Sequence, residues 1–371
     1  MTSEEFFRSI ELQYKSNLPF VVYRKPSNKK INSFLQKSDE LNFVNDFTEQ
    51  GFVFSPFDNI EKSVLIPTEI SQVNSTLFQA SDSFRTSPLS ESISKESKEN
   101  HINLINGCIN EIKNSDLKKV VLSRKETINF SETNPITIFK RLLYAYESAF
   151  AYCWYHPKVG LWLGATPESL IKIEGQRFSI MALAGTQNYA GNLDVEWQNK
   201  EKEEQQIVTD FIIENLKPSV VNYDVSDIET VKAGNLVHLK TMITAQLRSN
   251  IMLKQLINAL HPTPAVCGLP KATAKQFILN NEGYNREFYT GFLGELNFQN
   301  TKAPRAGNRN IENRAYSFTK KSTQLYVNLR CMQIKNQQAI IYVGGGITIA
   351  SNPESEWEET LAKSSIIKNV L

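Results

Sequence analysis

The sequence predicts an α+β fold in which large, mostly antiparallel β-sheets pack together and helices lie on the outside. Apolar strands follow one another through short glycine-containing turns, which favours antiparallel pairing over parallel units with crossover helices. Between these strands, several segments carry apolar residues at the spacing of an amphipathic helix. Many antiparallel strands with interspersed helices are typical of this fold class.

The first hundred residues end in a serine-rich stretch. Residues 71–100 contain few periodic apolar residues, so we expect a loop that connects a smaller N-terminal part to the main body. Directly after this stretch, Ile102, Ile105, Ile109 and Ile112 recur at helical spacing, which predicts a helix.

The rest of the chain alternates between predicted strands and helices. A strand is predicted over 118–130, followed by a helix over 135–148 that opens on a proline. Four strands joined by tight turns follow, over 149–156, 160–166, 168–175 and 176–185. The C-terminal half is predicted to contain a polar helix from Asp194 to Asn215, strands over 220–231 and 236–247, a helix over 270–282, strands over 288–298, 323–334 and 338–344, and a glutamate-rich terminal helix.

Composition and charge restrict the class of protein. The 41 basic and 39 acidic residues give a net charge of +2 without any long Lys/Arg block, so we expect neither a nucleic acid nor a membrane as partner. No stretch approaches the roughly 18 apolar residues of a membrane-spanning helix, and the first residues lack the apolar core of a secretory signal. The four cysteines are scattered, as expected of reduced thiols, and no apolar helix stripe calls for a partner subunit. We therefore expect a cytoplasmic monomer.

Glutamates recur at helical spacing in two distant segments. In the terminal helix, Glu356 and Glu359 share a face that Lys363 extends, and in "QNKEKEEQQIVTDFI" Glu201 and Glu204 are again three residues apart. Each segment alone also fits a solvated helix face, in which a Glu–Lys pair contributes about 0.2–0.5 kcal/mol. Two helices that each project a glutamate pair are able to enclose a hard divalent cation such as Mg²⁺.

Three further features are candidates for chemistry. Gly344–Gly346 in "YVGGGIT" follow an apolar strand. Glycine at these positions either lets the backbone approach a bound anion closely or allows the positive φ of a turn at the end of the strand. Strand alternation places Lys119 on the face of Val121 and Ser123, so that its side chain points either inward, as a desolvated general base, or to solvent. Glu168 follows a proline between two predicted strands. It is either a buried carboxyl that acts as a general acid or an ordinary turn residue.

Together these stretches resemble the chorismate-utilising enzymes, and among them the isochorismate synthases. The resemblance rests on ten motifs in family order, namely "KVVLSR", "GATPESL", "ALAGT", "KEKEEQQIVTDF", "VHLKT", "LHPTPAVCGLPK", "REFYTGFLGEL", "NLRCMQI", "YVGGGIT" and "SNPESEWEETLAK". It runs from about residue 118 to the C-terminus. It implies a single chorismate-binding catalytic domain over 1–371, with 1–100 as a divergent N-terminal part and 101–371 as the catalytic core.

The resemblance also implies a role for each candidate residue. Chorismate is a dicarboxylate whose ring carboxylate would be held against Mg²⁺. The implied metal ligands are Glu204 and Glu359, supported by Glu201 and Glu356. The implied substrate-binding residues are Gly185, His238, Ala265, Tyr289, Arg330, Gly344, Gly346 and Lys363. Among them, Lys363 and the glycine backbone would hold the ring carboxylate, and Arg330 with Tyr289 would meet the enolpyruvyl carboxylate, because a guanidinium fork matches carboxylate geometry.

The implied reaction converts chorismate to isochorismate. Water attacks ring atom C2 and the C4 hydroxyl departs. Lys119 would take the proton from water, and Glu168 would donate one to the leaving hydroxyl. For this, Lys119 must be at least partly neutral and Glu168 at least partly protonated near neutral pH, and burial favours both of these states.

Three positions favour this reaction over others of the family. Lys119 is generally absent from anthranilate synthases, which use ammonia. Ala184 stands where aminodeoxychorismate synthases carry a nucleophilic Lys, and Ala265 where anthranilate and salicylate synthases typically carry Thr. The alternatives are a salicylate synthase, which goes on to eliminate pyruvate, and a non-catalytic chorismate-binding homologue. The chain departs from the family at Gln205, where a His is usual. The resemblance does not distinguish among menaquinone, siderophore and salicylate synthesis as the use of the product.

Overall fold

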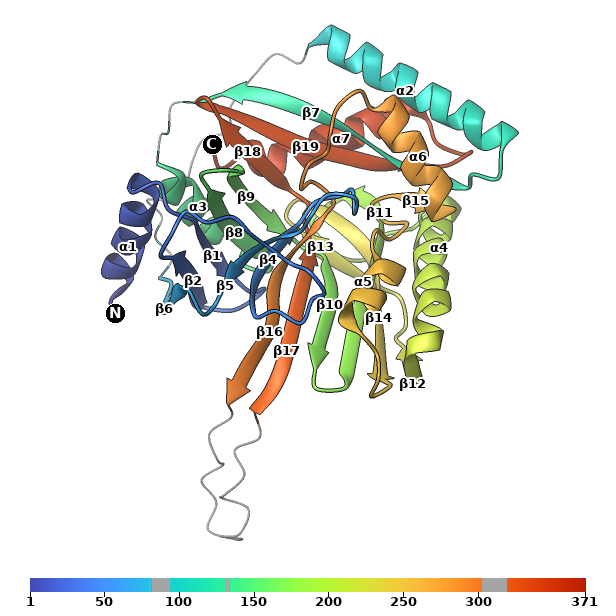
Figure 1. Ribbon diagram of the computed structural model, residues 1–371. Coiled ribbons are helices and arrows are strands. Elements are labelled where there is room, and N and C mark those ends of the chain that lie inside the picture. The colour runs from blue at the N-terminus through green and yellow to red at the C-terminus, as the bar shows by residue number, and fades with distance from the viewer. Residues whose placement is uncertain (80, 82–93, 131, 133, 302–318) are drawn as a thin grey trace.

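Two large antiparallel β-sheets and seven α-helices build the part of the protein that the computed structural model describes, in agreement with the predicted fold class (Figure 1). The description covers residues 1–79, 81, 94–130, 132, 134–301 and 319–371. None of the helices in these ranges combines the length and the apolar character needed to cross a membrane.

The first sheet has nine strands and includes both early and late parts of the chain. Its strands are β1 (Phe20–Arg24), β2 (Lys30–Gln36), β6 (Ser71–Leu77), β7 (Lys119–Asn129), β8 (Phe150–His156), β9 (Gly160–Thr166), β15 (Gly268–Leu269), β18 (Cys331–Lys335) and β19 (Gln338–Ile347). They pair in the order β15-β7-β19-β18-β9-β8-β1-β2-β6. The long pairing of β7 with β19 brings the middle of the chain beside its C-terminal part.

The second sheet has ten strands, nine of them along its main path. Its strands are β3 (Asn42–Phe43), β4 (Gly51–Ser55), β5 (Val64–Pro67), β10 (Ser169–Glu174), β11 (Arg177–Asn188), β12 (Val220–Val225), β14 (Leu236–Leu247), β16 (Phe292–Thr301) and β17 (Thr319–Val327), with β13 (Glu229–Ala233) attached to β14. The order is β12-β14-β11-β10-β17-β16-β4-β5-β3. The N-terminal residues therefore supply strands to both sheets.

Helices cover the outer faces of the sheets (Figure 1). They are α1 (Ser3–Lys15), α2 (Lys95–Asn114), α3 (Pro135–Ala145), α4 (Asn199–Leu216), α5 (Leu253–Leu260), α6 (Lys271–Asn281) and α7 (Pro353–Lys368), with the short 3₁₀ helix η2 (Lys217–Ser219) after α4. Helices α1 and α3 pack on the nine-stranded sheet, whereas α4 and α5 pack on the ten-stranded sheet. Helices α2, α6 and α7 lie over the β7–β19 end of the first sheet.

The two sheets face each other across an aromatic core. Strand alternation explains how it forms, because successive side chains of a strand point to opposite faces. In β8, for example, Phe150, Tyr152 and Trp154 belong to the core between the sheets, whereas Ala151 and Cys153 face α1 and α3. Aromatic rings fill such a space well, since each buries a large apolar area and adds edge or stacking contacts.

Two of the places where the chain passes between the sheets lie side by side. After β9 of the first sheet it enters the second sheet at β10, and after β17 of the second sheet it enters the first at β18. The two crossings are hydrogen-bonded to each other: Val327 donates its N–H to the Glu168 carbonyl at 3.1 Å, and Ala165 donates to the Arg330 carbonyl at 3.0 Å. Residues 323–334 are therefore two strands in different sheets, and the prediction of one strand is wrong there.

Other predicted elements differ from the structure at their ends. Within the predicted connector 71–100, residues 71–77 form edge strand β6 and residues from Lys95 onward belong to α2, while 80 and 82–93 lie outside the described residues. Strand β6 escaped prediction because it is polar and largely exposed, paired to β2 on one side. Helix α4 begins at Asn199 rather than Asp194. Helices α1 and α5 and strands β1 to β5 were not predicted.

Candidate active site

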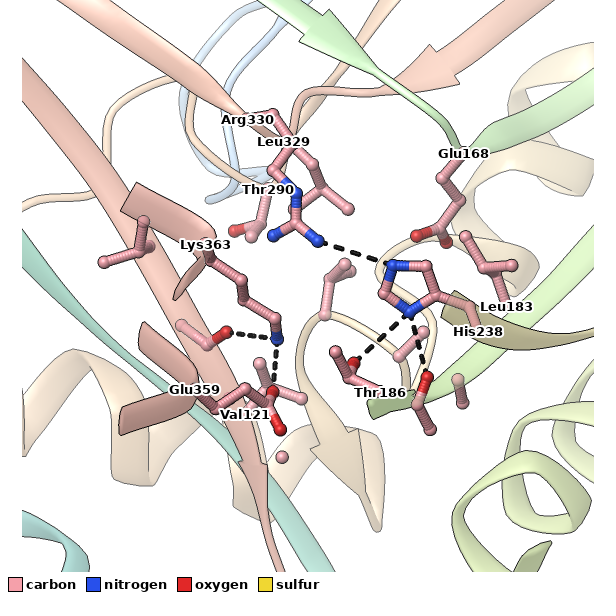
Figure 2. A pocket seen from close by; sticks show the side chains of 18 of the residues that line it. Val121, Glu168, Leu183, Thr186, His238, Thr290, Leu329, Arg330, Glu359 and Lys363 are labelled. Carbon is pink, nitrogen blue, oxygen red and sulfur yellow. Dashed lines mark hydrogen bonds and ion pairs between the residues drawn. The ribbon is translucent and has the colours of Figure 1, made fainter. Parts of the chain in front are cut away.

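A pocket lies where the two crossings meet β7, β19, β11, β14 and the helices α4 and α7 (Figure 2). It is lined by twelve of the fourteen site residues predicted from the sequence, namely Lys119, Glu168, Gly185, Glu204, His238, Ala265, Tyr289, Arg330, Gly344, Gly346, Glu359 and Lys363. The remaining two, Glu201 and Glu356, do not line it.

Lys119 points inward, which decides between the two orientations that the sequence left open. It opens β7, and its neighbours Val120 and Leu122 pack under α2 and α6, so that Lys119 and Val121 face the pocket. Only 2% of Lys119 is exposed. Its ammonium lies 3.3 Å from Glu204 Oε2 on α4, which makes a buried ion pair between two predicted site residues.

Glu168 is a buried carboxyl at the crossing from β9 to β10, which excludes an ordinary solvated turn. Burial raises its pKa to about 8, although the cationic Arg330, Lys119 and Lys363 act in the opposite direction. At neutral pH most of these carboxyl groups therefore carry a proton. A protonated carboxyl in a pocket is able to serve as a general acid.

Arg330 and His238 face each other across the pocket (Figure 2). Arg330 is the last residue of the second crossing, with a positive φ of 47°, and its Nη2 lies 3.5 Å from His238 Nε2. His238 Nδ1 lies 2.9 Å from the Gly185 carbonyl, which requires an N–H at Nδ1. Burial and the Arg330 charge lower the pKa of His238 to about 3, so that the ring is neutral.

Gly344–Gly346 are part of β19, so the alternative of a strand-end turn with positive φ is wrong. None of the three has a positive φ, and all pair with Leu122 and its neighbours in β7. Because β18 pairs with β19 only up to Tyr342, the glycine segment has a strand neighbour on one side and the pocket on the other. Small size is what this position requires: a Cβ on Gly344 would lie 2.5 Å from the Leu122 carbonyl oxygen.

Gly185 has the positive φ that a turn at Gly344–Gly346 would have needed. Its φ is +70°, within an irregular stretch of the β11–β14 pairing. A Cβ there would lie 3.0 Å from the Cβ of Glu201 in the first turn of α4. Glycine thus allows β11 to bulge and the start of α4 to approach it, which positions the glutamates of α4.

Lys363 and Glu359 form one turn of α7 that faces the pocket (Figure 2). Lys363 Nζ donates to Glu359 Oε1 at 2.5 Å and to the Gly344 carbonyl at 2.8 Å. Burial acts to raise the pKa of Glu359, but the adjacent Lys363 ammonium outweighs it and holds this pKa below its usual value. The opposite face of α7 is solvated, since Glu354 and Glu358 are exposed and Glu354 pairs with Lys98.

Glu356 and Glu201 lie behind this wall of the pocket. Burial and repulsion from Glu359 raise the pKa of Glu356, against the nearby Lys200, whose ammonium hydrogen-bonds Glu356 Oε1. Glu201 Oε2 is buried and has no hydrogen-bond partner among the described residues. In the described ranges no three His, Cys, Asp or Glu side chains are arranged to hold a metal ion as they stand. Three of the candidate ligands, Glu204, Glu356 and Glu359, are instead paired with lysines.

The chemistry of these donors nevertheless suits Mg²⁺. A Cβ on Gly345 would lie 3.4 Å from Glu356 Oε2 and 3.5 Å from Glu359 Oε1, and one on Gly346 would lie 3.1 Å from Glu204 Oε2. Carboxylate oxygens from two helices therefore converge on two successive residues of β19. Oxygen donors of this kind are the ligands that Mg²⁺ prefers.

Sequence reasoning missed part of the pocket. The unpredicted lining residues include Leu183, Thr186, Val266, Thr290, Leu329 and Tyr342. Several of them stand beside predicted residues in the motifs, and that adjacency was the available signal. Lys200 was missed as well, although it precedes Glu201 and is four residues from Glu204.

Gln205, the departure from the family pattern, faces away from the pocket. Its Nε2 donates to the Ala182 carbonyl and to Thr241 Oγ1, each at 3.1 Å. These are residues of β11 and β14, so Gln205 fixes α4 to the sheet below it.

Comparison with known proteins gives consistent results. Two family models, both described as chorismate binding enzymes, match residues 52–302 and 316–369. Isochorismate synthase MenF of Haemophilus influenzae is 25% identical over 270 residues, which cover 70% of this chain and 58% of the relative. Isochorismate synthase EntC of Escherichia coli K12 is 30% identical over 263 residues, which cover 68% of this chain and 62% of the relative.

The fold is shared with a solved structure along nearly its whole length. The crystal structure of a putative 2,3-dihydroxybenzoate-specific isochorismate synthase, DhbC from Bacillus anthracis, superimposes with a TM-score of 0.78 at 20% identity, over 98% of this chain and 99% of that one. The chain spans about 60% of the length of the two curated relatives above. Because the larger family match alone covers well over half of the sequence, the chain belongs to the chorismate-binding enzymes.

Proposed function

We propose that this protein is an isochorismate synthase that converts chorismate to isochorismate with the help of Mg²⁺. The observation that carries the proposal is a single pocket that combines a buried lysine, a buried carboxyl whose pKa is about 8, and two further cationic side chains. A base, an acid and two cations match a reaction in which water adds to a dicarboxylate and a hydroxyl leaves. The matched relatives named isochorismate synthase support the same assignment.

The cationic residues provide for the two carboxylates of the substrate. Arg330 is buried, and its Nε has no hydrogen-bond partner among the described residues, so the guanidinium has donor capacity to offer a ligand. We assign it, with Tyr289, to the enolpyruvyl carboxylate. Lys363 and the pocket-facing edge of Gly344–Gly346 are assigned to the ring carboxylate.

Proton transfer is assigned to the two buried titratable groups. In this step Lys119 acts as the neutral amine. Water forms a bond to ring atom C2 and gives its proton to that amine, the double bonds shift, and the C4–O bond breaks as Glu168 protonates the departing hydroxyl. The atoms balance, because one water enters and one water leaves. General acid or base catalysis of this kind contributes about 10²–10⁴-fold for each group.

Mg²⁺ would be held by Glu204 and Glu359, with Glu201 and Glu356 in support. When bound, the ion would neutralise these carboxylates and attract the ring carboxylate of the substrate. Arg330 would orient the second carboxylate, and the neutral His238 lies beside its guanidinium. Ala265 leaves the pocket apolar at a position where relatives that eliminate pyruvate typically carry a hydroxyl.

The test is product identification. Purified protein is incubated with chorismate and Mg²⁺, the products are separated by chromatography and identified by NMR, and pyruvate is assayed with lactate dehydrogenase; a parallel sample contains EDTA. We expect isochorismate without pyruvate, and no turnover in EDTA. Salicylate and pyruvate as main products would indicate a salicylate synthase instead, and binding of chorismate without any turnover would indicate a non-catalytic homologue.

A further inference from the structure

We propose that Lys200 is the positioning residue of the acidic cluster: its ammonium holds Glu204 and Glu356 from behind, so that their other carboxylate oxygens face the metal position. The inference rests on the Mg²⁺ site of the proposed function and assigns a role to a residue outside the pocket.

Lys200 connects two helices through two buried carboxylates. Its Nζ hydrogen-bonds Glu356 Oε1 on α7 and lies 3.8 Å from Glu204 Oε1, one turn further along α4. The side chains of Glu356 and Glu204 are 2% and 11% exposed, so solvent screens neither contact strongly. The two glutamates are more than 150 residues apart in the chain, and the ammonium between them offsets their mutual repulsion.

The two oxygens of each glutamate face in different directions. Lys200 is on the Oε1 side of both, whereas Oε2 of Glu204 is next to Gly346 and Oε2 of Glu356 is next to Gly345. Glu359 Oε1 approaches Gly345 as well. A contact on Oε1 thus fixes the carboxylate plane and leaves Oε2 directed at the point where the oxygens converge.

The other two lysines of the cluster have a different place. Lys119 and Lys363 line the pocket beside Glu204 and Glu359, where the proposed function assigns Lys119 to proton transfer and Lys363 to the ring carboxylate of the substrate. Lys200 does not line the pocket. Its contacts are therefore with the carboxylates of the cluster and not with a ligand in the pocket. The next residue in the chain is Glu201, whose buried Oε2 has no hydrogen-bond partner among the described residues.

Positioning and charge predict opposite effects of removing Lys200. A positive charge near a cation site repels the cation, so Coulomb repulsion alone predicts tighter Mg²⁺ binding without it. Residues that orient metal ligands, in contrast, typically contribute about 10–100-fold to metal affinity. Lys200 does not line the pocket, and 26% of its side chain is accessible, so solvent weakens its repulsion of an ion in the pocket more than it weakens the direct contacts with the buried glutamates. We therefore expect the positioning effect to dominate.

The experiment measures Mg²⁺ affinity without substrate. Wild-type protein, Lys200→Met and Lys200→Gln are titrated with MgCl₂ by isothermal calorimetry, and the Mg²⁺-dependent rise of the melting temperature is recorded in parallel. Lys202→Met is the matched control, because it removes the same charge from an exposed position of the same helix. Lys200→Arg tests whether a second cation of different shape restores binding.

In both neutral variants we expect the Mg²⁺ dissociation constant to increase about tenfold or more. It should change by less than about twofold in Lys202→Met, and Lys200→Arg should bind Mg²⁺ more tightly than the neutral variants but less tightly than the wild type. Far-UV circular dichroism checks that each variant is folded, and the Gln variant, which keeps a polar side chain, serves if the Met variant is not. Unchanged or tighter Mg²⁺ binding in folded Lys200 variants would overturn the inference while leaving the proposed function intact. A wild-type protein that binds no Mg²⁺ would overturn the metal site itself and this inference with it.

Discussion

Glu168 shows how a single residue can be held in a state that serves chemistry at the expense of stability. The carboxyl is buried at the junction of two strands, and burial raises its pKa to about 8 even though Arg330, Lys119 and Lys363 favour its ionised form. In the unfolded chain the same group has a pKa near 4.5. Folding therefore keeps a proton on Glu168 that the unfolded chain releases above this value.

This difference predicts how Glu168→Gln changes stability. Between about pH 4.5 and pH 8 the folded protein binds one more proton at this site, so the free energy of unfolding falls as the pH rises through this window. Glutamine cannot ionise and removes the effect. We expect the free energy of unfolding of Glu168→Gln to increase relative to that of the wild type as the pH rises, by about 1.4 kcal/mol per pH unit and a few kcal/mol in all. Turnover of this variant should fall by about 10²-fold or more.

Urea unfolding of both proteins at pH 5 and pH 8.5 provides the measurement. A stability difference that is the same at both pH values would contradict the assigned protonation state. For the wild type, kcat/KM is expected to decline above about pH 8, as Glu168 loses the proton that it donates.

Lys119 permits a cleaner separation of chemistry from binding. In Lys119→Ala we expect turnover to fall by about 10²–10⁴-fold, because the base is lost, while the dissociation constant for chorismate changes little. Single-turnover kinetics and equilibrium binding measure the two quantities. Lys118→Ala removes an exposed lysine next to it and serves as the control. Undiminished turnover in Lys119→Ala would refute the base assignment.

At the scale of the element, β19 combines a structural and a functional demand in three consecutive glycines. A Cβ on Gly344 would lie 2.5 Å from a backbone oxygen of β7, whereas a Cβ on Gly346 would meet only side-chain atoms, at 2.8 Å from Lys119 Cε and 3.1 Å from Glu204 Oε2. Backbone in a paired strand cannot move without disturbing the ladder. Side-chain ends are able to shift.

We therefore expect different outcomes from the same substitution two residues apart. Gly344→Ala should destabilise the protein by about 1–3 kcal/mol through the strained β7–β19 pairing. Gly346→Ala should change stability by less than about 1 kcal/mol but displace Lys119 and Glu204, and so lower kcat by at least tenfold. Melting temperatures and steady-state kinetics of the two variants check this contrast. Equal loss of stability in both would show that Gly346 also has a structural role.

Much of the secondary structure was predictable because its periodicity is local. The isoleucine pattern of α2 and the alternation along β7 were sufficient to predict these elements. Strand β6 was not predictable, since an exposed edge strand carries polar residues that resemble those of a loop. Nor does a local pattern indicate that the chain changes sheets after Val327, because both halves of 323–334 contain apolar residues typical of a strand.

The site was predictable to the extent that its residues follow family motifs or helical spacing. The i,i+3 glutamates of α4 and α7 could be identified in this way, as could Lys119 and Glu168. Which oxygen of each glutamate faces the pocket depends on how two helices meet over β19, and spacing does not contain this information. The same reason explains why Lys200 was missed: its partner Glu356 is 156 residues away.

At the scale of the whole molecule, one buried ion pair ties segments from both sheets together. Arg286 donates from Nε to Glu282 Oε2 at 2.7 Å, from Nη2 to the Val121 carbonyl of β7 at 2.6 Å, and from Nη1 to Thr290 Oγ1 at 3.1 Å just before β16. Glu282 in turn accepts the N–H of Ser123 at 2.7 Å. Val121 and Thr290 line the pocket, so this pair also supports its shape.

Breaking this pair from one side should be costly. Arg286→Met leaves the Glu282 carboxylate buried without its cation, and we expect a loss of about 3–5 kcal/mol in the free energy of unfolding. The double variant Arg286→Met, Glu282→Leu should recover much of this loss, because neither charge then remains buried. As a control, Lys158→Met removes an exposed ion pair with Asp39 and should cost less than about 1 kcal/mol. Urea unfolding midpoints are measured for the wild type and the three variants. If the double variant is no more stable than Arg286→Met, the hydrogen bonds to β7 and Thr290, rather than the unpaired charge, account for the stability that Arg286 provides.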